Sequence, residues 1–179
     1  NGENFSFMFE RVNNVEELDL SSFHPINAKN LAGMFHRNNK LKKIVFNNFD
    51  TRNATAMHMM FLNCINLEEM DISSFKTGNV KNFNSMFRNL KKMKELNVAN
   101  FDMSSADTMV AMFDGCSALK KLDVTNWNVS NAKNLAMLFM NCSMLEELNV
   151  ANWNTGNATA MNNMFYGLEK MPELRVENW

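Results

Sequence analysis

Residues 102–127 read DMSSADTMVAMFDGCSALKKLDVTNW, and residues 128–153 repeat the same pattern as NVSNAKNLAMLFMNCSMLEELNVANW. The aromatic residue that closes each unit recurs every 26 positions, at Phe23, Phe49, Phe75, Phe101, Trp127, Trp153 and Trp179. A constant period of about 20 to 50 residues is typical of repeat proteins in which each unit buries its apolar face against its neighbours. The sequence therefore predicts one repeat domain over residues 1–179.

This domain divides into repeats of equal length. We expect a partial coil over 1–23 and full coils over 24–49, 50–75, 76–101, 102–127, 128–153 and 154–179, as a piece of a longer array. The unbroken register leaves no room for a linker between domains.

Composition narrows the class of protein. Hydrophobic residues make up 46% and charged residues 21%, which is typical of a globular chain. The net charge of -1 gives no field that would attract nucleic acid or an anionic membrane, and no run of about 20 apolar residues predicts membrane insertion.

The first half of each unit carries apolar residues at helical spacing. Ala106, Met109, Met112, Phe113 and Cys116 follow the pattern i, i+3, i+6, i+7, i+10, which predicts a helix of two to three turns. The column Asn63, Asn89, Gly115, Asn141 and Gly167, broken by Arg37, is expected to end this helix in the left-handed conformation.

A column of polar residues precedes the predicted helix: Asn27, Asn53, Asn79, Ser105, Asn131 and Asn157. These side chains fit a helix N-cap. They equally fit an amide ladder between neighbouring coils, and the sequence leaves both readings open.

The second half of each unit predicts a short strand. In Leu119, Leu122 and Val124 the last two residues alternate in and out, and so short a strand needs partners from neighbouring coils. Parallel strands joined through a helix are almost always connected in the right-handed sense. The predicted fold class is therefore α/β: a right-handed leucine-rich-repeat-type solenoid of 26-residue coils, with short parallel strands on one face and short helices on the other.

Charged residues before each strand nearly alternate in sign from coil to coil. The pairs are Glu16-Glu17, Lys42-Lys43, Glu68-Glu69, Lys94-Glu95, Lys120-Lys121 and Glu146-Glu147. They form either a charged binding stripe or, as we favour, a solvated face on which opposite charges on neighbouring strands stabilise the stack.

The pattern resembles a known family of bacterial surface proteins. The segment Leu122-Asp123-Val124-Thr125-Asn126-Trp127-Asn128-Val129-Ser130-Asn131-Ala132 and the preceding Met112-Phe113-Asp114-Gly115-Cys116-Ser117 resemble the 26-residue repeat of BspA-like leucine-rich-repeat proteins of Gram-positive bacteria and mycoplasmas. Leu138 and Asn38 depart from the pattern. The resemblance implies an extracellular solenoid on a bacterial lipoprotein or wall-anchored protein, usually adhesive, and brings no catalytic residue.

No arrangement of residues in the sequence points to catalysis, a metal or a cofactor. His24, His36 and His58 fall in different columns, and Cys64, Cys116 and Cys142 share one column without the spacing of a zinc site. We therefore predict no enzyme activity, no metal and no cofactor, with free buried thiols. Trp127, Trp153 and Trp179 are read as core residues, with stacking platforms for sugars as the alternative.

The outward side of the strands is the predicted binding surface, because it is polar and varies while the scaffold stays constant. The candidate residues are Asp19, Asp71, Asn97, Asp123, Asn149, Ser73 and Thr125. We expect a cell-surface adhesion module that binds a protein or glycan of a host or neighbouring cell. The alternative is a structural spacer or stalk, or an array that associates with itself through uncapped ends.

Overall fold

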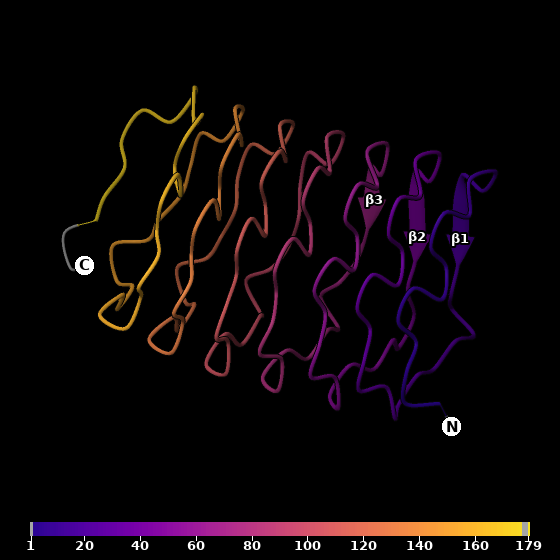
Figure 1. Cartoon of the computed structure of the whole chain (residues 1–179). Coiled ribbons are helices and arrows are strands. Elements are labelled where there is room, and N and C mark those ends of the chain that lie inside the picture. The colour runs from indigo at the N-terminus through magenta and orange to yellow at the C-terminus, as the bar shows by residue number, and fades with distance from the viewer. Residues whose placement is uncertain (1, 177–178) are drawn as a thin grey trace.

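The chain folds into a stack of coils, with the two termini at opposite ends (Figure 1). The computed structural model describes residues 2–176 and 179. Asn1 of the predicted partial coil and Glu177 and Asn178 of the last predicted coil lie outside these residues. Residues 26 positions apart pair in parallel from coil to coil, in an unbroken series of bridges: Asn4, Asn30, Ala56, Asn82, Thr108, Asn134 and Ala160.

One three-stranded parallel sheet forms in the first coils. Its strands are β1 (Glu17–Asp19), β2 (Lys43–Val45) and β3 (Glu69–Met70), in the order β1-β2-β3. Leu18 pairs with Ile44, and Ile44 with Met70. Further along the stack the same column continues as single parallel bridges that join Glu95 to Lys121 and Lys121 to Glu147.

The segment predicted to be helical is a run of tight turns instead. In the coil that contains Phe61, the amides of Met60, Leu62 and Cys64 each bond to a carbonyl three residues earlier, at 3.1–3.3 Å. The amides between them bond to the next coil, as Phe61 does to Met86 O at 2.9 Å. A helix would bond every amide within its own segment, so this alternation excludes one.

Residues in the left-handed conformation occur at two columns within the run of turns. The first column is Phe7, Gly33, Met59, Ser85, Ala111, Met137 and Asn163, and the second is Arg11, Arg37, Asn63, Asn89, Gly115, Asn141 and Gly167; all have φ between 54° and 79°. The second column is the predicted left-handed column, and Arg37 keeps its conformation. These residues close turns rather than a helix.

The predicted fold class is therefore wrong. The described part of the chain, residues 2–176 and 179, contains three short strands and no helix. It is not an α/β leucine-rich-repeat-type solenoid with helices on one face. The physical reason is that successive four-residue turns place apolar side chains three and four positions apart, which is also the spacing of a helix.

The interior of the stack is a continuous apolar core. Phe35, Phe61, Phe87 and Phe113 are buried and stack ring on ring, with centroids 5.3–5.7 Å apart. The indole N–H groups of Trp127 and Trp153 donate to Val98 O and Val124 O of the preceding coil at 3.1 and 3.2 Å. Both indoles are therefore core residues.

The Asn column forms an amide ladder between coils. The side-chain amides of Asn53, Asn79, Asn131 and Asn157 donate to carbonyls 27 residues earlier, at 2.7–2.9 Å. Because no helix follows these residues, the N-cap alternative is excluded. The ladder satisfies loop carbonyls that no strand pairing reaches.

Candidate functional site

We define the sheet face as the two columns of side chains that point outward from the strands and from their continuation along the stack. One column is Glu17, Lys43, Glu69, Glu95, Lys121, Glu147 and Glu173, and the other is Asp19, Val45, Asp71, Asn97, Asp123, Asn149 and Arg175. Between these columns lie core residues such as Ile44 and Leu122, which are 2% and 3% exposed. Because inward and outward residues alternate, polar side chains cover this face and buried apolar side chains lie beneath them.

The structure places five of the seven predicted binding residues on this face and the other two beside it. Asp19, Asp71, Asn97, Asp123 and Asn149 are exposed members of one column. Ser73 and Thr125 lie two residues after Asp71 and Asp123, and Thr125 is half-buried.

Each acidic or amide residue of this column also shapes its own backbone. The Oδ1 atoms of Asp19, Asp71 and Asp123 accept hydrogen bonds from the amides of Ser21, Ser73 and Thr125, at 2.8–3.1 Å. Asn97 and Asn149 accept from Ala99 and Ala151 in the same way, at 3.2 Å. These are Asx turns, which bend the chain at the end of the strand segment. The sequence signal for these turns is the recurring Asp-x-Ser/Thr spacing, and the turns were not predicted.

The Asx turns also affect the titration of the carboxylates. Hydrogen bonds from the Ser21 backbone and side chain lower the pKa of Asp19. Hydrogen bonds from the Ser73 side chain and backbone lower the pKa of Asp71. Both groups therefore stay ionised to a lower pH than an ordinary aspartate.

Ion pairs cross the sheet face between neighbouring coils. Lys43 Nζ lies 3.2 Å from Glu69 Oε2, and Lys121 Nζ lies 2.7 Å from Glu147 Oε1. The hydrogen bond that each lysine donates to its carboxylate raises the pKa of that lysine. Because these side chains are exposed, the pairs contribute little to stability. The favoured interpretation, that charges of opposite sign neutralise each other between coils, agrees with these pairs.

The pairing does not neutralise the whole face. The two columns hold eight carboxylates, those of Glu17, Asp19, Glu69, Asp71, Glu95, Asp123, Glu147 and Glu173, against three cations, Lys43, Lys121 and Arg175. The sheet face is therefore acidic although the chain as a whole is nearly neutral.

Three hollows follow one another along the sheet face. One of about 490 Å³ lies over β2 and β3 and is lined by Phe46, Glu69 and Asp71. The next, of about 540 Å³, lies between Glu95 and Asp123. The largest, of about 680 Å³, spans the last coils and is lined by Asp123, Glu147, Asn149, Met171 and Arg175.

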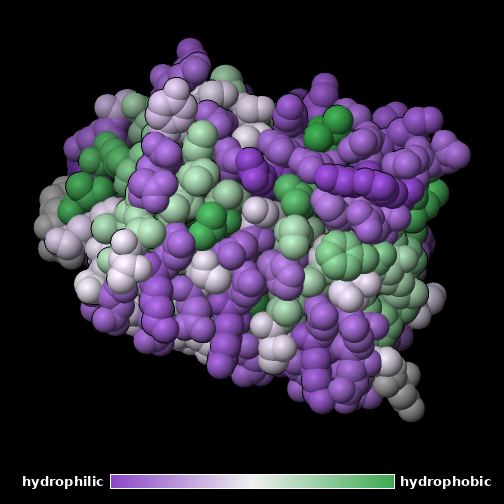
Figure 2. Space-filling view, in the orientation of Figure 1, coloured by the Kyte–Doolittle hydropathy of each residue, from purple (hydrophilic) through white to green (hydrophobic). Residues whose placement is uncertain are grey.

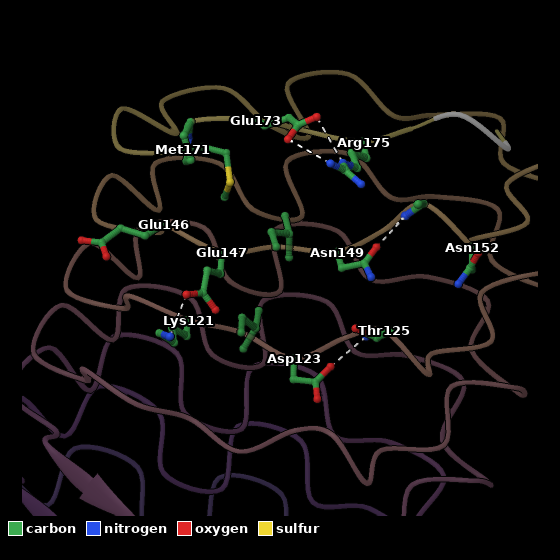
Figure 3. Close-up of a pocket in the computed structure, with 14 residues that line it drawn as sticks. Lys121, Asp123, Thr125, Glu146, Glu147, Asn149, Asn152, Met171, Glu173 and Arg175 are labelled. Carbon is green, nitrogen blue, oxygen red and sulfur yellow. Dashed lines mark hydrogen bonds and ion pairs between the residues drawn. The ribbon is translucent and has the colours of Figure 1, made fainter.

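The close-up of the largest hollow shows how its polar groups are arranged. The Lys121–Glu147 pair, the Asp123 and Asn149 turns and the Glu173–Arg175 pair lie on successive coils and project from one surface (Figure 3). Polar side chains therefore surround a floor that includes Leu122 and Leu148. Such a surface can bind a partner through hydrogen bonds and charge.

Other sequence candidates lie in the core. Cys64, Cys116 and Cys142 are free, buried thiols, as predicted.

Within residues 2–176 and 179, no group of three or more His, Cys, Asp or Glu side chains is placed to hold a metal ion. The same residues contain no helix with the length and apolar character needed to cross a membrane.

Comparison with known proteins identifies a family. A family model described as "Mycoplasma protein of unknown function, DUF285" matches residues 3–122 and again residues 91–179. No curated protein and no solved structure matches the chain. The match supports the mycoplasma part of the resemblance seen in the sequence but not the BspA-like leucine-rich-repeat assignment. Because the two matches cover nearly every residue, the chain belongs to the DUF285 family.

Proposed function

We propose that this chain is a non-enzymatic interaction module that binds a protein or glycan through its sheet face, at the bacterial cell surface. The observation that carries the proposal is the row of three hollows along one exposed polar face. Stacked repeats create extended surfaces of this kind, and proteins use them to contact partners. The surface location and the adhesive role rest on the resemblance to BspA-like surface proteins.

The rigidity of the face supports this role. Its residues project from a backbone that pairs with neighbouring coils on both sides, and Asx turns hold the ends of its strand segments. A partner that binds here does not have to order a flexible loop. This reduces the entropic cost of binding.

The test measures binding of the fluorescently labelled chain to cultured epithelial cells by flow cytometry. Asp71→Arg with Asp123→Arg reverses two charges in the middle of the face. Asp71→Asn with Asp123→Asn removes the charges but keeps the Oδ1 acceptors, as Asn97 and Asn149 show. We expect both double variants to lose at least tenfold in apparent affinity.

A control with the same change in charge is Asp107→Arg with Glu169→Arg, two exposed residues away from the sheet face. This control should bind like the unchanged chain. Equal binding by all four proteins, or no saturable binding by the unchanged chain, would remove the sheet face as the binding site. Thermal unfolding of each variant separates loss of contact from loss of folding.

A further inference from the structure

The hollow over β2 and β3 has an apolar floor that is partly open to solvent. Its volume is about 490 Å³, and Val45, Phe46 and Met70, which line it, are only half-buried. In the largest hollow, Leu122 and Leu148 occupy the column of Met70 and are buried. A partner that enters the hollow over β2 and β3 therefore meets apolar side chains that it can cover.

This floor results from two departures from the repeat pattern in a single coil. Val45 is the one apolar residue of its column, whose other members are Asp19, Asp71, Asn97, Asp123, Asn149 and Arg175. Phe46 is the one aromatic residue of its column, whose other members are Leu20, Ile72, Val98, Val124, Val150 and Val176. Because the other coils fold without these two residues, the repeat fold does not require them. Their presence in one coil indicates a local role.

The backbone and packing of this coil are adapted to the two residues. Val45 has no side-chain acceptor for an Asx turn, and Asn48 instead adopts φ = 54°, alone in its column among residues 2–176 and 179. The ring of Phe46 makes edge-to-face contacts with Phe49 and Phe75, with centroids 4.9 and 5.3 Å apart. These contacts hold the half-buried ring at the hollow.

The charges around this floor are not balanced. The hollow is lined by four carboxylates and one cation, Lys43, which lies 3.2 Å from Glu69. The other three carboxylates, Glu68, Asp71 and Glu95, have no ion-pair partner in the described part of the chain, residues 2–176 and 179. The next hollow, in contrast, is lined by three lysines and two carboxylates. An excess of negative charge therefore coincides with the accessible apolar floor.

A side chain that matches both features has a long aliphatic stem and a cationic end. Lysine and arginine cover apolar surface with such stems while the charged group stays in contact with water. Their hydrogen bonds to carboxylates are stronger than those between neutral groups. A sugar has no long aliphatic stem, and an acidic sugar would be repelled here. On the side of the stack that Figure 2 shows, apolar patches likewise lie among hydrophilic residues.

We propose that the hollow over β2 and β3 binds a basic segment of a partner protein. The stem of a lysine or arginine lies on the apolar floor, and its cationic group lies among the three unpaired carboxylates. The inference rests on the proposed function of the sheet face and selects a protein rather than a glycan as the partner. Because the site is open to solvent, salt should weaken the binding.

The test titrates the chain with short peptides and follows the methyl group of Met70 by NMR. The methionine methyl groups carry ¹³C, and Met70→Leu assigns the Met70 signal. A blocked heptapeptide of glycine and serine with two arginines should shift this signal in a saturable way, and so should the lysine version. The signal of Met137, half-buried in the run of turns, should not move. No saturable shift of the Met70 signal by either peptide would overturn the proposal.

Two modified peptides separate the stem from the charge. Citrulline keeps the shape of arginine without its charge, and 2,4-diaminobutyric acid keeps a cationic amine on a shorter stem. Each of these peptides should bind at least fivefold more weakly than the arginine peptide. Equal binding of the citrulline peptide would contradict the role of the carboxylates, and equal binding of the short cation would contradict the role of the floor.

A triple variant removes the three unpaired charges: Glu68→Gln, Asp71→Asn and Glu95→Gln. It should lose at least tenfold in affinity for the arginine peptide, and Asp71→Asn keeps the acceptor of its turn. The matched control is Asp102→Asn, Asp107→Asn and Glu169→Gln, which makes the same change in charge at exposed residues away from the sheet face. The control should bind like the unchanged chain. Equal affinities of the two triple variants would overturn the assignment to this hollow.

Val45→Asn tests the floor without adding a charge. It introduces the residue type that Asn97 and Asn149 already have in this column, so the fold should tolerate it. We expect at least a threefold loss in affinity for the arginine peptide. Unchanged affinity would remove Val45 and the floor from the site. Circular dichroism checks that each variant is folded.

The outcomes separate this inference from the proposed function. If the peptides do not bind but binding to cells still depends on the sheet-face charges, the basic segment is wrong and the proposed function remains. If the peptides bind at Met70 but the chain does not bind cells, the role at the cell surface is wrong and the site for a basic segment remains.

Discussion

The thiol of Cys64 donates a hydrogen bond to the carbonyl oxygen of Phe35, one coil earlier, with 2.9 Å between Sγ and O. Cys116 and Cys142 repeat this bond with Phe87 and Phe113 at 3.1 and 3.2 Å. The buried polar residue Asn38 occupies the same column and donates to Phe9 O at 2.7 Å. Four coils therefore place a small hydrogen-bond donor in this column, which explains why Asn can replace Cys there, whereas Leu90 fills the same position with an apolar side chain.

The environment of these thiols predicts that they do not react in the folded protein. Burial raises the pKa of Cys64 and of Cys116 to about 12, and it raises the pKa of Cys142 well above its usual range. Because the thiolate is the reactive form, a disulfide reagent at pH 8 should modify none of the three in the native chain. All three should react within minutes in denaturant. Rapid modification of one thiol without denaturant would show that its coil opens locally.

The left-handed column predicts a stabilising substitution at Arg37. This exposed residue has φ = 61°, at a column where every later coil uses Asn or Gly. A side chain with a Cβ atom is strained in this conformation, so Arg37→Gly should raise the free energy of unfolding by about 0.5–1 kcal/mol. Arg37→Ala is the matched control, because it removes the charge but keeps the Cβ atom. An equal gain from both variants in urea unfolding would attribute the effect to charge instead of strain.

Gly115 lies in the same column as Arg37, but its substitution should have the opposite effect on stability. A Cβ atom added at Gly115 would collide with Oδ1 of Asn89, and φ is +74°. Gly115→Ala should therefore lower the free energy of unfolding by at least about 1 kcal/mol. Arg37→Gly is the comparison, because it relieves the same conformation at an exposed position of the same column and should be stabilising. A neutral Gly115→Ala in thermal and urea unfolding would contradict the left-handed conformation of this column.

Much of the coil architecture could be predicted from the sequence, because the buried column is marked by aromatic residues and one left-handed column by Asn and Gly. The aromatic column Phe75 to Trp153 is buried as its constancy indicated, and the Asn and Gly residues of the column that ends at Gly167 are left-handed. The run of turns could not be distinguished from a helix. Most residues of the deciding left-handed column, such as Met59, Ser85 and Ala111, are not of a type that favours that conformation.

The candidate site was predictable in position but not in its details. Asp71 and Asp123 point outward as the alternation at Ile72 and Val124 predicts, and their exposure follows from the same pattern. Their Asx turns depend on backbone geometry after the strand. The hollows depend on how Glu147 and Met171 from different coils are spaced, which no single repeat encodes.

The amide ladder predicts that one substitution adds a missing bond. Asn79 donates to Arg52 O at 2.9 Å, but Ser105 in the same column is too short to reach Gly78 O, its counterpart in the preceding coil. Ser105→Asn should add this bond and raise the free energy of unfolding by about 0.5–1.5 kcal/mol. Asn79→Ser should cost a similar amount. No change from either variant in urea unfolding would show that water satisfies these carbonyls equally well.

The Asx turn at Asp71 predicts a loss of stability in acid. Hydrogen bonds from Ser73 lower the pKa of Asp71 below its ordinary value of 3.8, so the folded state favours the ionised carboxylate. This contribution is fully present above about pH 5 and is lost as the pH falls through the lowered pKa, because the unfolded chain binds the proton first. In Asp71→Asn the acceptor remains but does not titrate. The difference in the free energy of unfolding between the unchanged chain and this variant should therefore shrink steadily between about pH 5 and pH 2.

Asn97→Asp is the reciprocal control for this prediction, because Asn97 makes the same turn with Ala99. This substitution should introduce acid sensitivity where there was none, so that the variant loses stability relative to the unchanged chain as the pH falls over the same range. Parallel urea-unfolding curves for all three proteins at every pH would contradict a role for the carboxylate in the turn. Because these side chains are exposed, salt should reduce only the part of the effect that comes from distant charges. The part that comes from the hydrogen bond donated by the Ser73 amide should remain.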